Sequence, residues 1–199
     1  IEKTFGKLEA RPLPERTQYP TTAFEQDERY SAKLGYMPEL YIAYNGVPVG
    51  DKDELLLDFL GEILSNSMQI GLLDELTLDN KLMYAGAAND VRRDQGRFLV
   101  IAVPYMDAET QTYTSLKETE KLVNDVIQQL VSGNISEELV EAVRQNFYQE
   151  FDRTMEYPEM KVQLLQNAFT YQQSIEEMLQ LKEQVAAITM DDLKNAAKK

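Results

Sequence analysis

The chain has 199 residues with a formal net charge of −14, and 43% of its residues are hydrophobic. This length is typical of one domain and is sufficient to bury a full hydrophobic core. The sequence contains no histidine and no cysteine, which excludes Ser-His-Asp and Cys-His catalysis, disulfides, and zinc sites built from imidazole or thiolate ligands.

The negative charge argues against nucleic acid as a partner, because an acidic surface repels the phosphate backbone. Acidic residues are densest over residues 51–79, where Lys52 is the only basic residue. A solvated helix face explains this stretch, and steering of cationic peptides is the alternative. No apolar run is long enough to span a bilayer. Without cysteines to indicate a redox compartment, cytoplasm and periplasm are both compatible.

Residues 1–20 predict a linker, because they contain several prolines and charges of both signs. Residues 21–199 predict a single α+β domain. The chain does not begin with Met, and its last residues, DDLKNAAKK, end inside a helical pattern. We therefore expect a domain excised from a longer protein.

Three strands are expected in the first half of the chain. Residues 40–44 are β-branched and aromatic, with alternate residues on opposite faces, and the turn signal Asn45-Gly46 follows them. Residues 82–88 and 96–103 predict two further strands joined by a turn. The continuous apolar run of the last strand indicates burial on both faces, at least in part.

Helical periodicity is expected from Asp51, again from about residue 71, and after Pro104 to the end of the chain. One of these helices is expected to run through residues 175–185. Residues suited to cap helix ends lie at Ser115, Gly133, Ser136 and Thr189. Strands followed by helices indicate an α+β fold, with a mostly antiparallel sheet and helices packed on one face. The other face must be solvated or must contact another domain.

The order of these elements resembles the non-catalytic, C-terminal-type domain of the insulinase/pitrilysin zinc metallopeptidases, a family that includes the mitochondrial processing peptidases. The resemblance covers about residues 35–199. Its main segments are MPELYIAYNGVPVGDKDELLLDFLGEIL, GLLDELTLDNKLMYAGAA, GRFLVIAVPY, LVSGNISEELVEAVRQNF and QVAAITMDDLKNAAKK.

The resemblance implies one half of a clamshell. In the family, one domain carries the zinc motif His-x-x-Glu-His, and a homologous domain without zinc closes the chamber and helps to hold an extended peptide. A chain without histidine matches the closing domain. The implied partners are therefore an extended peptide and a zinc-bearing domain in the same or another chain. This chain is expected to hold no cofactor, metal ligand or catalytic residue, and to be inactive alone.

Family members also contribute an Arg and, seven residues later, a Tyr that face the substrate. Tyr84 matches the Tyr, whereas Thr77 occupies the Arg position. A threonine cannot act as a cationic clamp on a carbonyl or oxyanion. Tyr84 is therefore either a phenol that binds substrate or a strand aromatic placed for packing.

Ala85, Gly86 and Ala87 are unusually small for a strand. Small side chains allow another backbone to approach, either a packed helix or a peptide strand. The candidate substrate-binding residues are thus Thr77, Tyr84, Ala85, Gly86 and Ala87. Two main functions follow: a peptide-binding closing domain of a zinc metallopeptidase, or a structural or assembly domain of a homologue that has lost peptidase activity. An unrelated enzyme that uses two carboxylates is a third reading.

Overall fold

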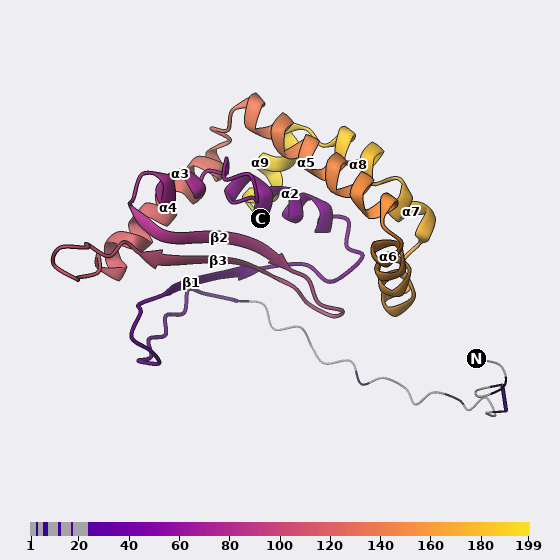
Figure 1. Cartoon of the computed structure of the whole chain (residues 1–199), viewed down its shortest axis with the longest axis horizontal. Helices are drawn as coiled ribbons and strands as arrows, with labels where there is room; N and C mark the ends of the chain where they lie inside the picture. The colour runs from indigo at the N-terminus through magenta and orange to yellow at the C-terminus, as the bar shows by residue number, and fades with distance from the viewer. Residues whose placement is uncertain (1–2, 4–5, 8–11, 13–16, 18–23) are drawn as a thin grey trace.

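An antiparallel sheet forms the base of the molecule (Figure 1). The computed structural model describes residues 3, 6–7, 12, 17 and 24–199, so most of the linker predicted over residues 1–20 lies outside the described residues. The strands are β1 (Leu40–Asn45), β2 (Leu82–Asp90) and β3 (Arg97–Pro104), in the order β1-β3-β2. The central strand β3 buries Phe98, Val100 and Ala102 toward the core. The predicted strands are confirmed.

Helices cover one face of this sheet. In chain order they are α2 (Glu54–Leu64), α3 (Asp74–Leu78), α4 (Leu116–Ser132), α5 (Glu137–Glu156), α6 (Pro158–Tyr171), α7 (Ile175–Leu179), α8 (Leu181–Ala187) and α9 (Met190–Ala197). Helices α2 and α3 pack on β2, and α4 packs on β3. Helix α5 lies outside α2 and contacts α8 (Figure 1). The predicted α+β class, with an antiparallel sheet and helices on one face, is confirmed.

The predicted capping residues lie at helix ends. The side chains of Ser115, Ser136 and Thr189 each accept a first-turn N–H group, and Gly133 ends α4 with a left-handed φ of 77°. Each cap satisfies a main-chain group that has no partner inside its helix.

Two boundaries differ from the sequence expectation. Helix α2 begins at Glu54 rather than near Asp51, and Asp51 Oδ1 instead accepts the N–H of Asp53 at 2.8 Å. The helix expected through residues 175–185 is divided into α7 and α8. At the division, the N–H of Gln180 bonds the carbonyl of Glu177, three residues earlier, so the α-helical bonding pattern is interrupted there.

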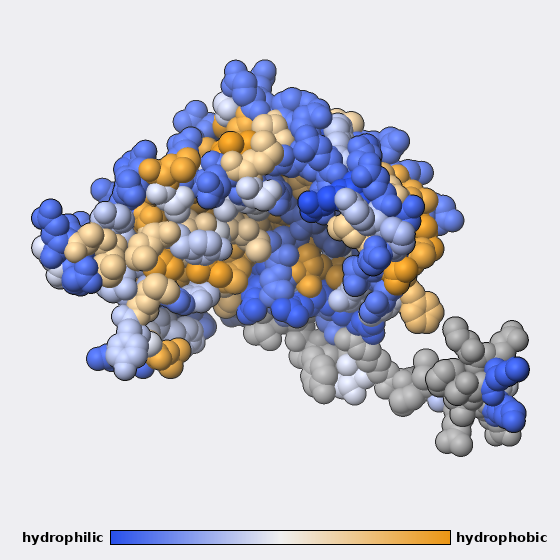
Figure 2. Space-filling view, in the orientation of Figure 1, coloured by the Kyte–Doolittle hydropathy of each residue, from blue (hydrophilic) through white to orange (hydrophobic). Residues whose placement is uncertain are grey.

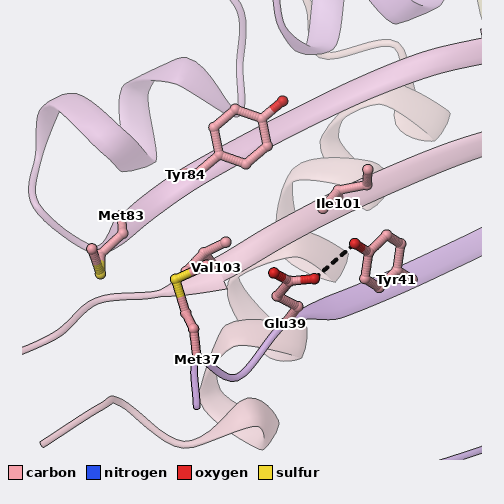
Figure 3. A pocket seen from close by; sticks show the side chains of 7 residues that line it. All are labelled: Met37, Glu39, Tyr41, Met83, Tyr84, Ile101 and Val103. Atoms are coloured by element: carbon pink, nitrogen blue, oxygen red, sulfur yellow. Dashed lines mark hydrogen bonds between the residues drawn. The ribbon is translucent and has the colours of Figure 1, made fainter. Parts of the chain in front are cut away.

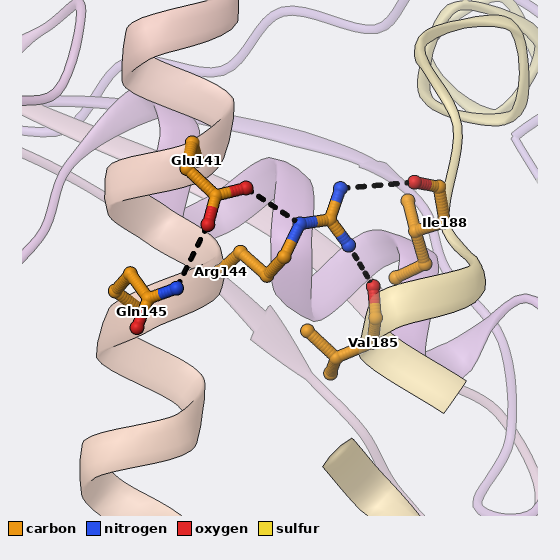
Figure 4. Close-up of polar contacts among 5 residues, drawn as sticks. All are labelled: Glu141, Arg144, Gln145, Val185 and Ile188. Carbon is orange, nitrogen blue, oxygen red and sulfur yellow. Dashed lines mark hydrogen bonds and ion pairs between the residues drawn. The ribbon is translucent and has the colours of Figure 1, made fainter. Parts of the chain in front are cut away.

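Arg144 of α5 connects helix α5 to the end of helix α8 through hydrogen bonds (Figure 4). Its guanidinium donates to the main-chain carbonyl of Val185 and to that of Ile188 at 3.1 Å, and Nε donates to Glu141 at 3.1 Å. The guanidinium carbon lies 5.9 Å from the centre of the Phe59 ring. A cation is favourable beside these carbonyls because they end helix α8.

Part of the acidic stretch over residues 51–79 is buried, so a solvated helix face is the wrong interpretation for these residues. Asp74 is 5% exposed and accepts the N–H of Gly71 at 2.8 Å. Asp58 of α2 accepts a hydrogen bond from Nδ2 of Asn89 on β2 at 2.9 Å. Burial raises the pKa of Asp58 to about 6; the bond from Asn89 opposes this rise, and the charge of Glu54 adds to it.

We expect Arg144→Met to lower the free energy of unfolding by about 2–4 kcal/mol, because it leaves two carbonyls of the α8 end without their donor. Arg153→Met is the matched control. Arg153 also pairs with a glutamate three residues earlier, but it is exposed, so its loss should change stability by less than about 0.5 kcal/mol. Urea denaturation measures the stability of both variants. Equal losses of stability in the two variants would contradict the role of Arg144.

We also expect Asp58→Asn to stabilise the chain at pH 8 and to change little at pH 4. The folded-state pKa of about 6 lies above the ordinary value of 3.8. The folded chain therefore binds more protons between these pH values, and stability falls as the pH rises through this window. The gain at pH 8 should be about 1–3 kcal/mol.

The control for this pH dependence is Asp107→Asn, measured by the same denaturation series. Hydrogen bonds from Thr110 hold the pKa of Asp107 below its usual range. Stability from that carboxylate is present above the ordinary pKa and is lost as the pH falls, so this substitution should destabilise the chain at pH 8. A gain in stability at pH 8 from Asp107→Asn, or no gain in stability from Asp58→Asn, would refute the raised pKa assigned to Asp58.

Candidate functional site

The sheet face opposite the helices carries a groove of about 380 Å³ (Figure 3). Ile101 and Val103 of β3 form its floor, and the rings of Tyr41 and Tyr84, from the two outer strands, form its sides. Met37, Glu39 and Met83 complete the lining. We call it the Tyr84 groove. In the space-filling view, apolar side chains gather over this end of the sheet, where β2 begins and β3 ends (Figure 2).

A β-bulge places Tyr84 on this open face. Leu82 lies opposite Pro104 and Tyr84 lies opposite Val103, so β2 contains one residue more than β3 between these pairs. In a regular strand, residues two apart point to the same side. Here Leu82 is 2% exposed and belongs to the core, whereas Tyr84 is 53% exposed. The bulge therefore directs Tyr84 away from the helices, which is a common use of bulges beside functional sites.

Gly86 leaves room for the Tyr84 ring. A Cβ atom at residue 86 would lie 2.6 Å from the Tyr84 hydroxyl oxygen, so the ring lies along β2 over this glycine. The structure thus brings these two candidate residues together on the open face.

Ala85 and Ala87 point to the other face, toward the helices. Ala85 is buried in the core, and Ala87 packs against it. A Cβ atom on Gly61 of α2 would lie 3.8 Å from the carbonyl oxygen of Ala87. Small residues on both elements therefore allow α2 to approach β2 closely, and neither alanine lines the Tyr84 groove.

Thr77 also lies outside the groove lining. It belongs to α3, and its hydroxyl donates to the carbonyl of Asp74 at 2.7 Å. The hydroxyl is thereby used within its own helix.

Three residues of the groove, in the segment that precedes β1 and continues into it, were not among the site residues predicted from the sequence. Met37, Glu39 and Tyr41 line it together. Their spacing of two residues is the signal that could have identified them, because such residues share one face of an extended chain. The Tyr41 hydroxyl donates to Glu39 Oε2 at 2.7 Å. This bond, with the negative charge of Glu39, raises the pKa of Tyr41.

The described residues do not assemble the usual ligands of a zinc ion. Histidine and cysteine are absent from the sequence, and the described residues contain no group of three acidic side chains arranged to hold a metal. Within the described residues, no helix is both long and apolar enough to cross a membrane.

Solved structures share this fold. The inactive peptidase domain of a candidate zinc protease from Bordetella parapertussis is 20% identical, with a TM-score of 0.67 over 83% of this chain and 87% of that chain. A protease from Helicobacter pylori is 17% identical, with a TM-score of 0.70 over 80% of this chain and 37% of that chain. The peptidase M16 inactive domain from Pseudomonas fluorescens is 17% identical, with a TM-score of 0.66 over 80% of this chain and 37% of that chain.

This chain therefore spans little more than a third of the Helicobacter and Pseudomonas chains and most of the Bordetella domain. No curated protein gives a match. The profile of the family described as the peptidase M16 inactive domain matches residues 1–147, most of the chain. The resemblance to insulinase-type metallopeptidases is confirmed, and the chain belongs to the M16 peptidase family as an inactive, C-terminal-type domain.

Proposed function

We propose that this chain closes the chamber of an M16 zinc peptidase and holds the peptide there in extended form. A homologous zinc-bearing domain, in the same chain or in a partner chain, supplies the metal and the chemistry. The observation that carries this proposal is the Tyr84 groove, which lies on the sheet face that the helices leave open.

The sheet offers a peptide both a main-chain partner and a side-chain contact. Strand β2 is an outer strand of the described sheet, and an outer strand can pair its free N–H and C=O groups with an added peptide strand. Tyr84 belongs to the same strand and is half exposed. Its phenol can donate a hydrogen bond to a peptide carbonyl, while its ring contacts a peptide side chain.

One observation favours the alternative, a structural or assembly domain without a role in proteolysis. Thr77 bonds the carbonyl of Asp74 within its own helix, so this position contributes no positive charge toward a substrate. A domain that only packs against a partner needs neither that charge nor a peptide groove.

The test measures binding of fluorescently labelled ten-residue peptides to the 199-residue chain by anisotropy. We expect binding without cleavage when zinc is added, because the chain lacks histidine and cysteine. Tyr84→Ala should weaken binding about tenfold, the loss typical of a central interface aromatic. Tyr157→Ala is the control, because Tyr157 is also 53% exposed and lies at the junction of α5 and α6.

Circular dichroism verifies that both variants are folded. If Tyr84→Ala binds peptides as well as the unaltered chain does, the groove is not the binding site. If the folded chain binds no peptide, the structural or assembly role is favoured. Zinc-dependent cleavage by the purified chain would contradict the non-catalytic assignment.

A further inference from the structure

The charged residue that lines the Tyr84 groove is acidic, like the chain as a whole. Its lining is apolar or aromatic except for Glu39, and the described residues that line it include no lysine or arginine. A negatively charged ligand group would therefore be repelled by Glu39, with no lysine or arginine in the lining to offset the repulsion. A positively charged group could instead form an ion pair with Glu39. The net charge of −14 acts in the same direction over a longer range.

Glu39 lines the groove as an exposed side chain with a hydrogen-bond partner two residues away. The Tyr41 hydroxyl donates to its Oε2 at 2.7 Å, and Figure 3 shows the carboxylate beside the apolar floor formed by Val103 and Ile101. The hydroxyl engages one carboxylate oxygen, which leaves Oε1 to accept a hydrogen bond from a guest. Bonds from an ammonium or guanidinium group to a carboxylate are stronger than neutral hydrogen bonds.

The groove is similar in size to a small ligand pocket. Its volume of about 380 Å³ lies near the lower end of the range of about 300–1,000 Å³ for ligand pockets. A space of this size accommodates one long side chain and its neighbouring main chain. The methionines at positions 37 and 83 can adjust to the guest, because their side chains are unbranched and flexible.

The walls of the groove suit a side chain that is apolar along its length and positively charged at its end. Lysine and arginine side chains lay their methylene stems along apolar surface while their charged ends remain hydrated or paired. The faces of Tyr41 and Tyr84 attract cations, and this attraction adds to the charge of Glu39.

We propose that the Tyr84 groove selects a lysine or arginine side chain of the bound peptide, and that Glu39 determines this charge preference. The inference rests on the proposed peptide-holding function and adds the class of side chain that the site recognises. The apolar walls contribute affinity for the methylene stem of the side chain, and Glu39 discriminates among side chains whose ends differ in charge.

The experiment compares three otherwise identical peptides that carry lysine, norleucine or glutamate at one central position. Norleucine keeps the whole carbon stem of lysine and lacks its charged amino group. The unaltered chain should bind the lysine peptide about two- to fivefold more tightly than the norleucine peptide, as is typical of a partly exposed ion pair. The glutamate peptide should bind most weakly. The preference for lysine should shrink in 0.5 M NaCl, because salt screens the charges.

Glu39→Gln should remove the difference in affinity between the lysine and norleucine peptides. Glu28→Gln is the matched control. Glu28 accepts a hydrogen bond from the tyrosine two residues later, Tyr30, at 2.6 Å, just as Glu39 does from Tyr41, but Glu28 does not line the groove. This variant should keep the full preference for lysine.

The outcomes separate the two proposals. Equal binding of lysine and norleucine peptides, with both weakened by Tyr84→Ala, overturns the charge preference and leaves the peptide-holding function standing. A preference that both glutamine variants reduce equally arises from the general surface charge, and also overturns the role of Glu39. Absence of binding by all three peptides overturns both proposals.

Discussion

The β-bulge at Met83 and Tyr84 is the constraint on which the open face of the sheet depends. Leu82 must enter the core, where it is 2% exposed, and a regular strand would place Tyr84 on the same side. The additional residue in β2 lets Leu82 pack under the helices while Met83 and Tyr84 both border the groove. Burial of one leucine and exposure of one tyrosine, two residues apart, are compatible only through this irregularity.

The elements could be predicted from sequence because their signals are local. The caps at Ser115, Ser136 and Thr189 depend on residues within one helical turn, and the alternating faces of β1 follow from strand geometry. The same alternation rule fails in β2, because the bulge arises from pairing with β3, across the hairpin. Tyr84 could therefore be proposed from the sequence, but the groove around it could not.

Similar residues in one segment turned out to have different surroundings. Ala85 and Ala87 allow α2 to approach, whereas Gly86 accommodates the Tyr84 ring on the opposite face. In the acidic stretch, Asp74 is buried and accepts main-chain N–H groups, whereas Asp79 pairs with Lys81 at the surface. Composition could not separate these cases, because burial is decided by segments that are distant in sequence.

In the proposed function, the distribution of charge around the groove suits a domain that holds a peptide and does not cleave it. Thr77 offers no cation to a developing oxyanion, and the charged residue that lines the groove is Glu39. In the proposed arrangement, this domain contacts parts of the peptide whose charge does not change during the reaction. Such contacts stabilise the bound peptide and the transition state equally, so they lower KM without raising kcat. The stabilisation that is specific to the transition state must then come from the zinc-bearing partner domain.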